Sequence, residues 1–263
     1  MKPFRLIASF MRASFQEDAA YRTNFFISLL TSILNLVTGV VGIVVLFGQI
    51  ESVHGWTLAS TLAVLGVYLT VSAVRGLFIG PSFDSLSGMD GEIWSGAFDF
   101  TILRPVNTQF FASFRKWRLF ALLDLVLGVG VLVAAVVKLG VALSVWKILF
   151  FLFMLAVGMS ILYAILLIFA ALIFWSPGVL FTWVFDGLFQ MARYPANIYP
   201  GWLRMVLTWI VPVGVITTFP ARALTDSITP LEWVVSLLLA AVLLAVASVL
   251  FKVGLRKYAS ASS

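Results

Sequence analysis

The sequence contains no cysteine and only one histidine, His54, among its 263 residues. Disulfide bonds, thiolate nucleophiles and cysteine-based metal sites are therefore excluded, and one histidine cannot build a metal site alone. Phosphate-binding loops of the GxxxxGK[ST] type, HExxH, GxSxG and paired-carboxylate motifs are also absent. We therefore expect a protein that is not an enzyme, does not hydrolyse ATP and binds no metal or cofactor within this chain.

Charged residues are scarce as well, since they make up 11% of the chain against 62% hydrophobic residues, and the mean hydropathy is +1.10. A membrane-spanning helix needs about 20 mostly apolar residues, and several runs reach that length. The composition thus predicts an all-α polytopic integral membrane protein in which residues 1–263 form one transmembrane domain. The net charge of +6 does not indicate nucleic-acid binding, because cations in a membrane protein set orientation and meet anionic headgroups.

Five long apolar runs are clear candidates for spans. They are Thr23 to Phe47, Leu58 to Ile79, Leu119 to Val137, Trp146 to Trp175 and Leu231 to Phe251. Cytoplasmic segments are enriched in Lys and Arg. If both termini and residues 80–118 lie inside, twelve of the 17 cations are cytoplasmic. The five cations left outside are Lys138, Lys147, Arg193, Arg204 and Arg222. We therefore expect a multi-pass protein of the cell inner (cytoplasmic) membrane with both termini cytoplasmic.

Termini on one side require an even number of crossings, so a sixth must lie between the fourth run and the last. Val179 to Ala192 is short for a crossing, and Trp202 to Phe219 contains Pro212 and Gly214. We expect the fifth span to begin near Val179, followed by a re-entrant hairpin in the outer leaflet over residues 195–220. In the alternative, Trp202 to Phe219 crosses fully and Val179 to Ala192 lies flat.

Two amphipathic stretches are predicted at the cytoplasmic surface. Residues 1–22 place Phe4, Ile7, Met11 and Phe15 at steps of three and four, opposite charged side chains, which is typical of an interfacial helix. Within the loop 80–118, apolar positions from Ile93 to Ile102 also fall at helical spacing. Arg104-Pro105 should end this second helix, because proline disfavours helical geometry in the preceding residue.

The segments GEIWSGAFDFTILRPVN, YPANIYPGWLR and IVPVGVITTFPARAL resemble the permease family of type 2 ABC exporters, and the resemblance spans essentially the whole chain. It implies six spans per permease, two permease subunits and two separate ABC ATPase subunits that bind ATP and Mg. The second permease is expected to be related rather than identical, and membrane lipid surrounds the complex. The resemblance also implies a coupling helix at Glu92 to Leu103 and an outer re-entrant hairpin at residues 195–220.

The coupling helix would dock into a groove on the ATPase. We expect Trp94 and Phe98 to be its apolar anchors, because interface centres favour buried aromatics, with Glu92, Asp99 and Arg104 as polar residues of the same contact. Without the resemblance, periodicity alone would equally allow a helix that lies on the inner headgroups.

Small and polar residues recur along one stripe of the first span, namely Ser28, Thr31, Ser32, Asn35 and Thr38, with Gly39 and Gly42. The stripe is either a helix-packing seam, as small residues allow in membranes, or part of the translocation path.

Two charges within predicted spans, Arg75 and Asp124, lie at similar depth from the cytoplasmic ends of their helices. We expect them either to form an intramembrane ion pair or to leave Arg75 snorkelling to the interface.

These features favour the permease of an ATP-driven exporter. The alternative is a secondary transporter driven by an ion gradient. Such proteins tend to place ionisable groups near the bilayer midplane and to contain internal repeats, whereas here the charged residues lie near span edges and we detect no repeat.

Overall fold

A computed structural model describes residues 3–20, 22–142, 144–176, 181–225 and 228–258. Within these ranges the chain is helical and contains no strand, apart from one isolated bridge between Val53 and Trp56. The elements are α1 (Pro3–Ala20), α2 (Arg22–Phe47), α3 (Leu58–Val74), η1 (Arg75–Ile79), α4 (Gly80–Asp84), α5 (Asp99–Ile102), α6 (Thr108–Phe114), α7 (Ala121–Leu139), α8 (Val145–Leu172), α9 (Phe181–Phe189), η2 (Gln190–Arg193), η3 (Ala196–Ile198), α10 (Gly201–Met205), η4 (Val206–Ile210), α11 (Val213–Thr225) and α12 (Pro230–Lys257).

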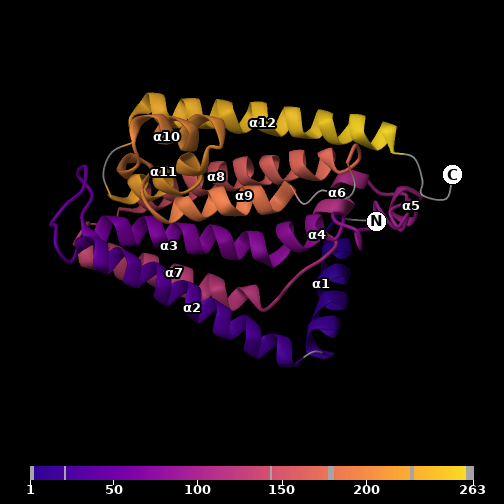
Figure 1. Ribbon diagram of the computed structural model, residues 1–263, viewed down its shortest axis with the longest axis horizontal. Coiled ribbons are helices and arrows are strands. Elements are labelled where there is room, and N and C mark those ends of the chain that lie inside the picture. Colours follow the sequence, from indigo (N-terminus) through magenta and orange to yellow (C-terminus); the bar gives the residue numbers. More distant parts are fainter. Residues whose placement is uncertain (1–2, 21, 143, 177–180, 226–227, 259–263) are drawn as a thin grey trace.

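Five helices of the described chain are long and apolar enough to span a membrane. They cover Thr23–Phe47, Leu58–Asp84, Ala121–Leu139, Val145–Leu172 and Pro230–Lys257, which confirms the five clear runs of the sequence. Figure 1 shows them running along the long axis of the molecule, with the N- and C-terminal ends of the chain at the same end of the bundle. We call this the terminal end. The protein is thus an all-α polytopic membrane protein.

Several spans begin or end at residues whose side chain or backbone conformation caps the helix. Thr57 starts α3 and Thr229 starts α12, each in a capping box with the residue three positions on, Ser60 and Glu232 respectively. Gly140 ends α7 with a left-handed φ of 62°, which a glycine adopts without steric cost.

The tightest helix pair is α3 with α7, and two glycines make it possible. A Cβ atom at Gly66 would lie 2.6 Å from the Cα of Leu132, and one at Gly128 would lie 2.7 Å from the backbone nitrogen of Thr70. Lipid tails give little hydrophobic drive for helix association, so close backbone contact of this kind contributes most of the attraction. Sequence analysis did not single out either glycine.

The region between α8 and α12 contains a short helix and a sharp bend. In Figure 1, α9 lies beside α8 and leads away from the terminal end, and a contact of 6.1 Å between the rings of Phe169 and Phe185 joins the two helices. The following pair, Gly201–Ile210 and Val213–Thr225, bends by 91° and stays at the opposite end. Residues 202–219 therefore form no straight helix, and a bent pair of this kind is either a broken span or a re-entrant loop.

Side chains of α11 hold the irregular backbone that precedes this bend. Thr218 Oγ1 accepts a hydrogen bond of 3.1 Å from the amide of Ala196, and Thr217 Oγ1 donates one of 3.1 Å to the carbonyl of Ala192. Both threonines are buried. Non-helical backbone at membrane depth requires such partners from the protein itself, and these two hydrogen bonds supply them.

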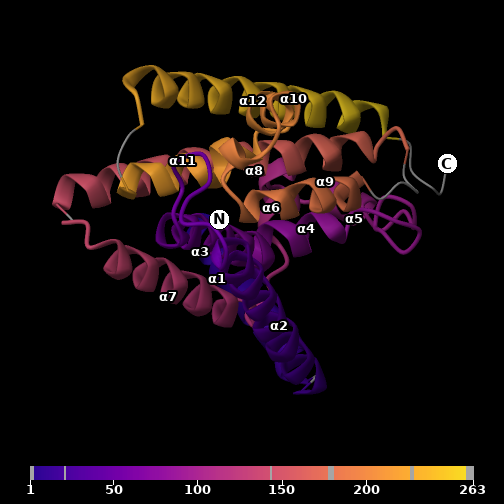
Figure 2. The same ribbon diagram turned by 60° about the vertical axis from the view of Figure 1, so that its left-hand side comes forward.

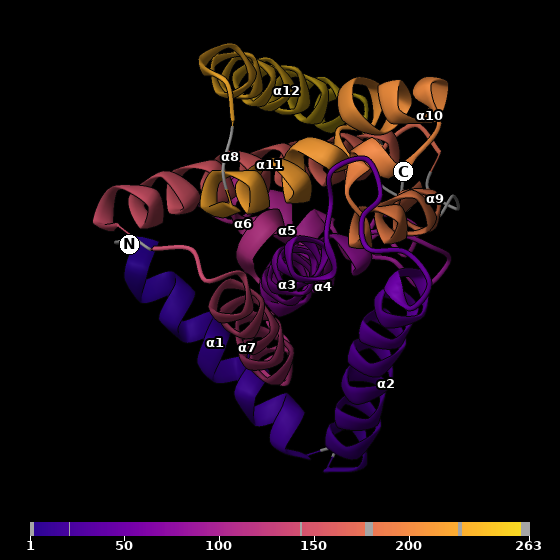
Figure 3. The same cartoon turned by 90° about the vertical axis from the view of Figure 1, so that its left-hand side faces the viewer.

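The two N-terminal helices stand apart from the compact part of the bundle. Figure 1 shows α1 lying across the long axis at the terminal end, and Figures 2 and 3 show α2 diverging from the other helices towards its junction with α1. Met11 and Phe15 on α1 are 37% and 59% exposed. Part of the predicted apolar face of α1 is thus uncovered by the chain, whereas Ile7 is half-buried.

Candidate functional site

The loop at the terminal end is folded, but it is not the continuous helix expected from Glu92 to Leu103. Residues 92–98 form turns, and only Asp99–Ile102 are α-helical. Gly96 interrupts the helix because it adopts a φ of 75°, in the left-handed region. The apolar spacing of the segment is real, but a glycine in its middle changes which side chains share a face.

Arg115, on the far side of this loop, holds it in place. Its guanidinium forms an ion pair with Glu92 and donates 2.8 Å to Ser85 Oγ and 3.4 Å to Thr101 Oγ1. The Arg115 side chain is 8% exposed and that of Glu92 is 22% exposed. Glu92, expected to contact a partner, therefore pairs inside the chain with Arg115, a residue that holds the loop and that sequence analysis did not single out.

Phe98 is the second correction, because its side chain is fully buried. Its ring lies 5.6 Å from that of Phe174, at the end of α8, and 5.5 Å from that of Tyr258, just after α12. Phe174 in turn packs on Phe251 of α12 at 5.4 Å. Phe98 cannot be a docking anchor. It joins the loop to the terminal ends of two spans.

Asp99 lies beside Tyr258 at this junction. Burial of the phenol, together with the neighbouring Asp99 carboxylate, raises the pKa of Tyr258 to about 12. Tyr258 therefore stays neutral at physiological pH and can donate to Asp99. This places Asp99 within the loop's attachment to α12.

The exposed apolar side chains of the loop form a separate set. Trp94 is 52% exposed, as its predicted role requires, and it is joined by Met89 at 75%, Phe100 at 71% and Leu103 at 80%. We call these four residues the loop patch. Large exposed apolar groups on a polar loop mark contact surfaces. Sequence analysis missed Phe100 and Leu103 because it assumed an unbroken helical phase across Gly96.

Beside the loop patch, a cavity of about 420 Å³ lies between the loop and α1. Arg104 and Phe100 line it from the loop and Phe10 from α1. The Arg104 guanidinium lies over the Phe111 ring at 4.6 Å, which keeps its charge at the cavity surface. Helix α1 is tied to the same region by Ser14 Oγ, which accepts 3.1 Å from the amide of Trp117.

Arg75 does not pair with Asp124. Its Nη2 lies 2.5 Å from Oδ1 of Asp186 on α9, and its guanidinium sits over the Phe185 ring at 5.8 Å. The expected pair was wrong because depth along two helices does not fix the direction in which their side chains point. Arg75 instead joins the second span to α9, in a π-helical turn of the kind often found at functional sites.

Asp124 lines a cavity of about 120 Å³ between α2, α3, α7 and η2. Ser32 and Asn35 of the polar stripe line the same cavity. Other stripe positions differ: Thr31 and Thr38 are exposed in the single chain, whereas Gly39 and Gly42 pack closely on Leu65 and Tyr194.

Arg193, counted above among the outer cations, also lines this cavity, with its guanidinium 5.4 Å above the Tyr68 ring. Its position is a correction to the charge count. It also weakens the argument that ionisable groups lie only near the span edges.

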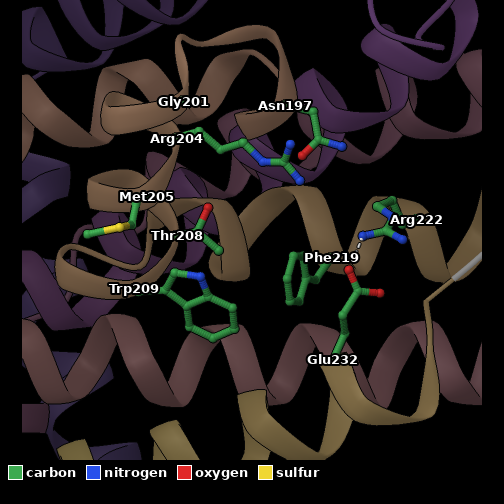
Figure 4. Close-up of a pocket in the computed structure, with 9 residues that line it drawn as sticks. All are labelled: Asn197, Gly201, Arg204, Met205, Thr208, Trp209, Phe219, Arg222 and Glu232. Carbon is green, nitrogen blue, oxygen red and sulfur yellow. Dashed lines mark hydrogen bonds and ion pairs between the residues drawn. The ribbon is translucent and has the colours of Figure 1, made fainter.

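A further cavity, of about 210 Å³, lies at the opposite end between the bent pair of residues 201–225 and the start of α12 (Figure 4). Arg222 Nη1 donates 2.6 Å to Glu232 Oε1, and the amide of Thr229 donates 2.9 Å to Glu232 Oε2. Arg204 points into the space beside Asn197 in this view. The ion pair fastens α11 to α12.

The fold and these surfaces define a multi-pass membrane protein with one folded loop at the end that carries both termini. Residues 33–262 match the family described as "ABC-2 family transporter protein", which covers most of the chain. The chain therefore belongs to the ABC-2 transporter family and is a membrane permease of an ABC transporter. Neither the curated proteins nor the solved structures gave a match.

Proposed function

We propose that this chain is the membrane-spanning subunit of an ATP-driven exporter and receives work from a separate ATPase through the loop between its second and third spans. The observation that carries the proposal is the loop patch, in which Trp94 and Leu103 expose large apolar side chains on a loop otherwise fixed by buried contacts. Family membership supports an ABC partner, which would bind the ATP and Mg that this chain has no motif to hold.

The contacts of the loop supply a route for force into the membrane. Phe98 joins the loop to α8 and α12 through Phe174 and Tyr258, and Arg115 joins it to α4 and α6. A partner that pushes on the loop patch therefore moves several spans together instead of bending the loop alone, because packed contacts shift as units. Arg104, at the rim of the α1 cavity, offers a cation to the same partner.

The proposal includes an orientation, a second permease and a substrate path. The terminal end faces the cytoplasm of the inner membrane, and the hairpin at residues 195–220 lies in the outer leaflet. Only 17% of the apolar part of α2 is buried within this chain. This exposure supports a second, related permease that packs against α2. The substrate would pass outward between the two permeases.

Co-purification tests the proposal. The full chain, expressed with its genomic neighbours and extracted in mild detergent, is expected to retain an ABC ATPase, and the double change Trp94→Ala with Leu103→Ala is expected to release it. The matched control is Trp146→Ala with Val145→Ala, which removes exposed apolar groups at the start of α8. Transport by the purified chain alone in a proton or sodium gradient would favour the secondary transporter instead.

A further inference from the structure

The cavity between α2, α3, α7 and η2 contains two opposite charges that do not meet. Among the described residues, neither Asp124 nor Arg193 forms an ion pair or a hydrogen bond, although both line the same space of about 120 Å³. Charged groups within spanning segments are costly unless they pair or face a polar space. Within the described part of the chain, the cavity thus holds two charges that lack an ion-pair partner, of which Arg193 contacts the ring of Tyr68.

Two further polar atoms of this lining also lack partners. Ser72 Oγ and Arg193 Nε are buried and make no hydrogen bond. Unsatisfied buried donors cost free energy, so their presence in a cavity points to a group that binds there. Asn35, exposed on α2, adds an amide at the open side of the cavity.

The charges restrict what can bind. An anion alone would meet the Asp124 carboxylate, a cation alone would meet the Arg193 guanidinium, and a neutral group would leave both charges unpaired. A group carrying an ammonium and a carboxylate or phosphate satisfies both. The volume equals roughly four water molecules, so only a compact group fits.

We propose that this cavity binds a compact zwitterionic group, with its ammonium at Asp124 and its anionic end at Arg193. The inference rests on the proposed exporter function and names the substrate class for it. The group is either the headgroup of a zwitterionic lipid or a soluble solute of the same chemistry. In both cases Ser72 and Asn35 supply further hydrogen bonds.

Binding to the purified full-length chain in detergent tests this. Dihexanoyl phosphatidylethanolamine is compared with its N-acetyl derivative, which lacks the ammonium, and with dihexanoyl phosphatidylglycerol. We expect the zwitterionic lipid to bind about tenfold more tightly than either, as the loss of one charge-assisted hydrogen bond implies. Equal binding of all three lipids by the unmodified chain would overturn the proposal, and this comparison needs no variant to fold.

Variants then assign the ends of the ligand. Asp124→Asn is expected to abolish the preference for the lipid with a free ammonium. Arg193→Gln is expected to weaken the binding of all three lipids. Lys138→Gln, on the same helix outside the cavity, should change nothing. A preference retained in Asp124→Asn would contradict the assignment.

Soluble phosphoethanolamine separates the two sources. Competition with the lipid at comparable concentration would identify a soluble solute, whereas binding of the lipid without such competition would identify a headgroup. ATPase retention by Asp124→Asn is expected to equal that of the unmodified chain. Failure of the binding test would therefore leave the proposed exporter function standing.

Discussion

Arg75 in η1 and Asp186 in α9 form an ion pair, with 2.5 Å between Nη2 and Oδ1, and their side chains are 16% and 41% exposed. This pair joins the second span to the short helix α9. It acts together with the contact between the rings of Phe169 and Phe185 to hold α9 against the longer helices.

Charge reversal tests this contact. Arg75→Asp and Asp186→Arg are each expected to lower stability by about 2 kcal/mol, since each leaves like charges in contact in a partly exposed setting. The double change should recover most of the loss in a thermal unfolding measurement of the detergent-solubilised chain. Arg75→Asp with Asp124→Arg is the matched control and should show no recovery. If stability recovered in that control, Arg75 would pair with Asp124, as the sequence suggested, and not with Asp186.

Phe98 and Trp94 are expected to separate stability from partner binding. Phe98→Ala opens a buried site and should cost about 3 kcal/mol or more. Trp94→Ala changes a half-exposed side chain and should cost less than about 1 kcal/mol while weakening ATPase retention. Unfolding temperature and pull-down, measured on both variants, distinguish the roles. If Phe98→Ala were as stable as the unmodified chain, its place as the junction with α8 and α12 would be wrong.

Arg115 should be essential to the shape of the loop. Arg115→Met leaves the Glu92 carboxylate without its cation and is expected to cost about 3 kcal/mol. Hydrogen exchange over residues 85–104 should increase. Adding Glu92→Gln to the Arg115→Met chain should recover part of the protection from hydrogen exchange, because it removes the unpaired Glu92 carboxylate. Lys257→Met, at the end of α12, is the control.

The α3 and α7 pair can be tested with two glycines on one helix. Gly128→Ala places a Cβ against the backbone of Thr70 and should destabilise the chain by about 2 kcal/mol. Gly130→Ala meets no atom within 4 Å and should stabilise by about 0.5 to 1 kcal/mol through helix propensity. Equal effects would show that α7 does not approach α3 closely in the membrane.

The sequence alone was sufficient to predict the five clear spans and the family. Long apolar runs are a strong signal, so the five clear spans agree with the structure to within a few residues at most ends. The exposure of Trp94 also agrees with the sequence, whereas its role as a docking anchor stays a prediction.

Side-chain partners could not be found in the same way. Helical spacing does not show which face of a span meets which neighbour, so Asp186 was not recognised as the partner of Arg75. It also does not show where a glycine changes the chain direction, so Phe98 was assigned to the surface and Phe100 was overlooked. Arg193 was misplaced because its neighbour Tyr68 is remote in sequence.

The most direct test uses a single thiol at the loop patch, which is possible because the native chain has no cysteine. In cells expressing the Leu103→Cys variant with its genomic neighbours, a membrane-impermeant maleimide should leave intact cells unlabelled and label inside-out vesicles. A short bifunctional crosslinker should join the same position to an ABC ATPase subunit. Labelling from outside the cell would contradict the account, because the loop would then face away from any source of ATP-driven work.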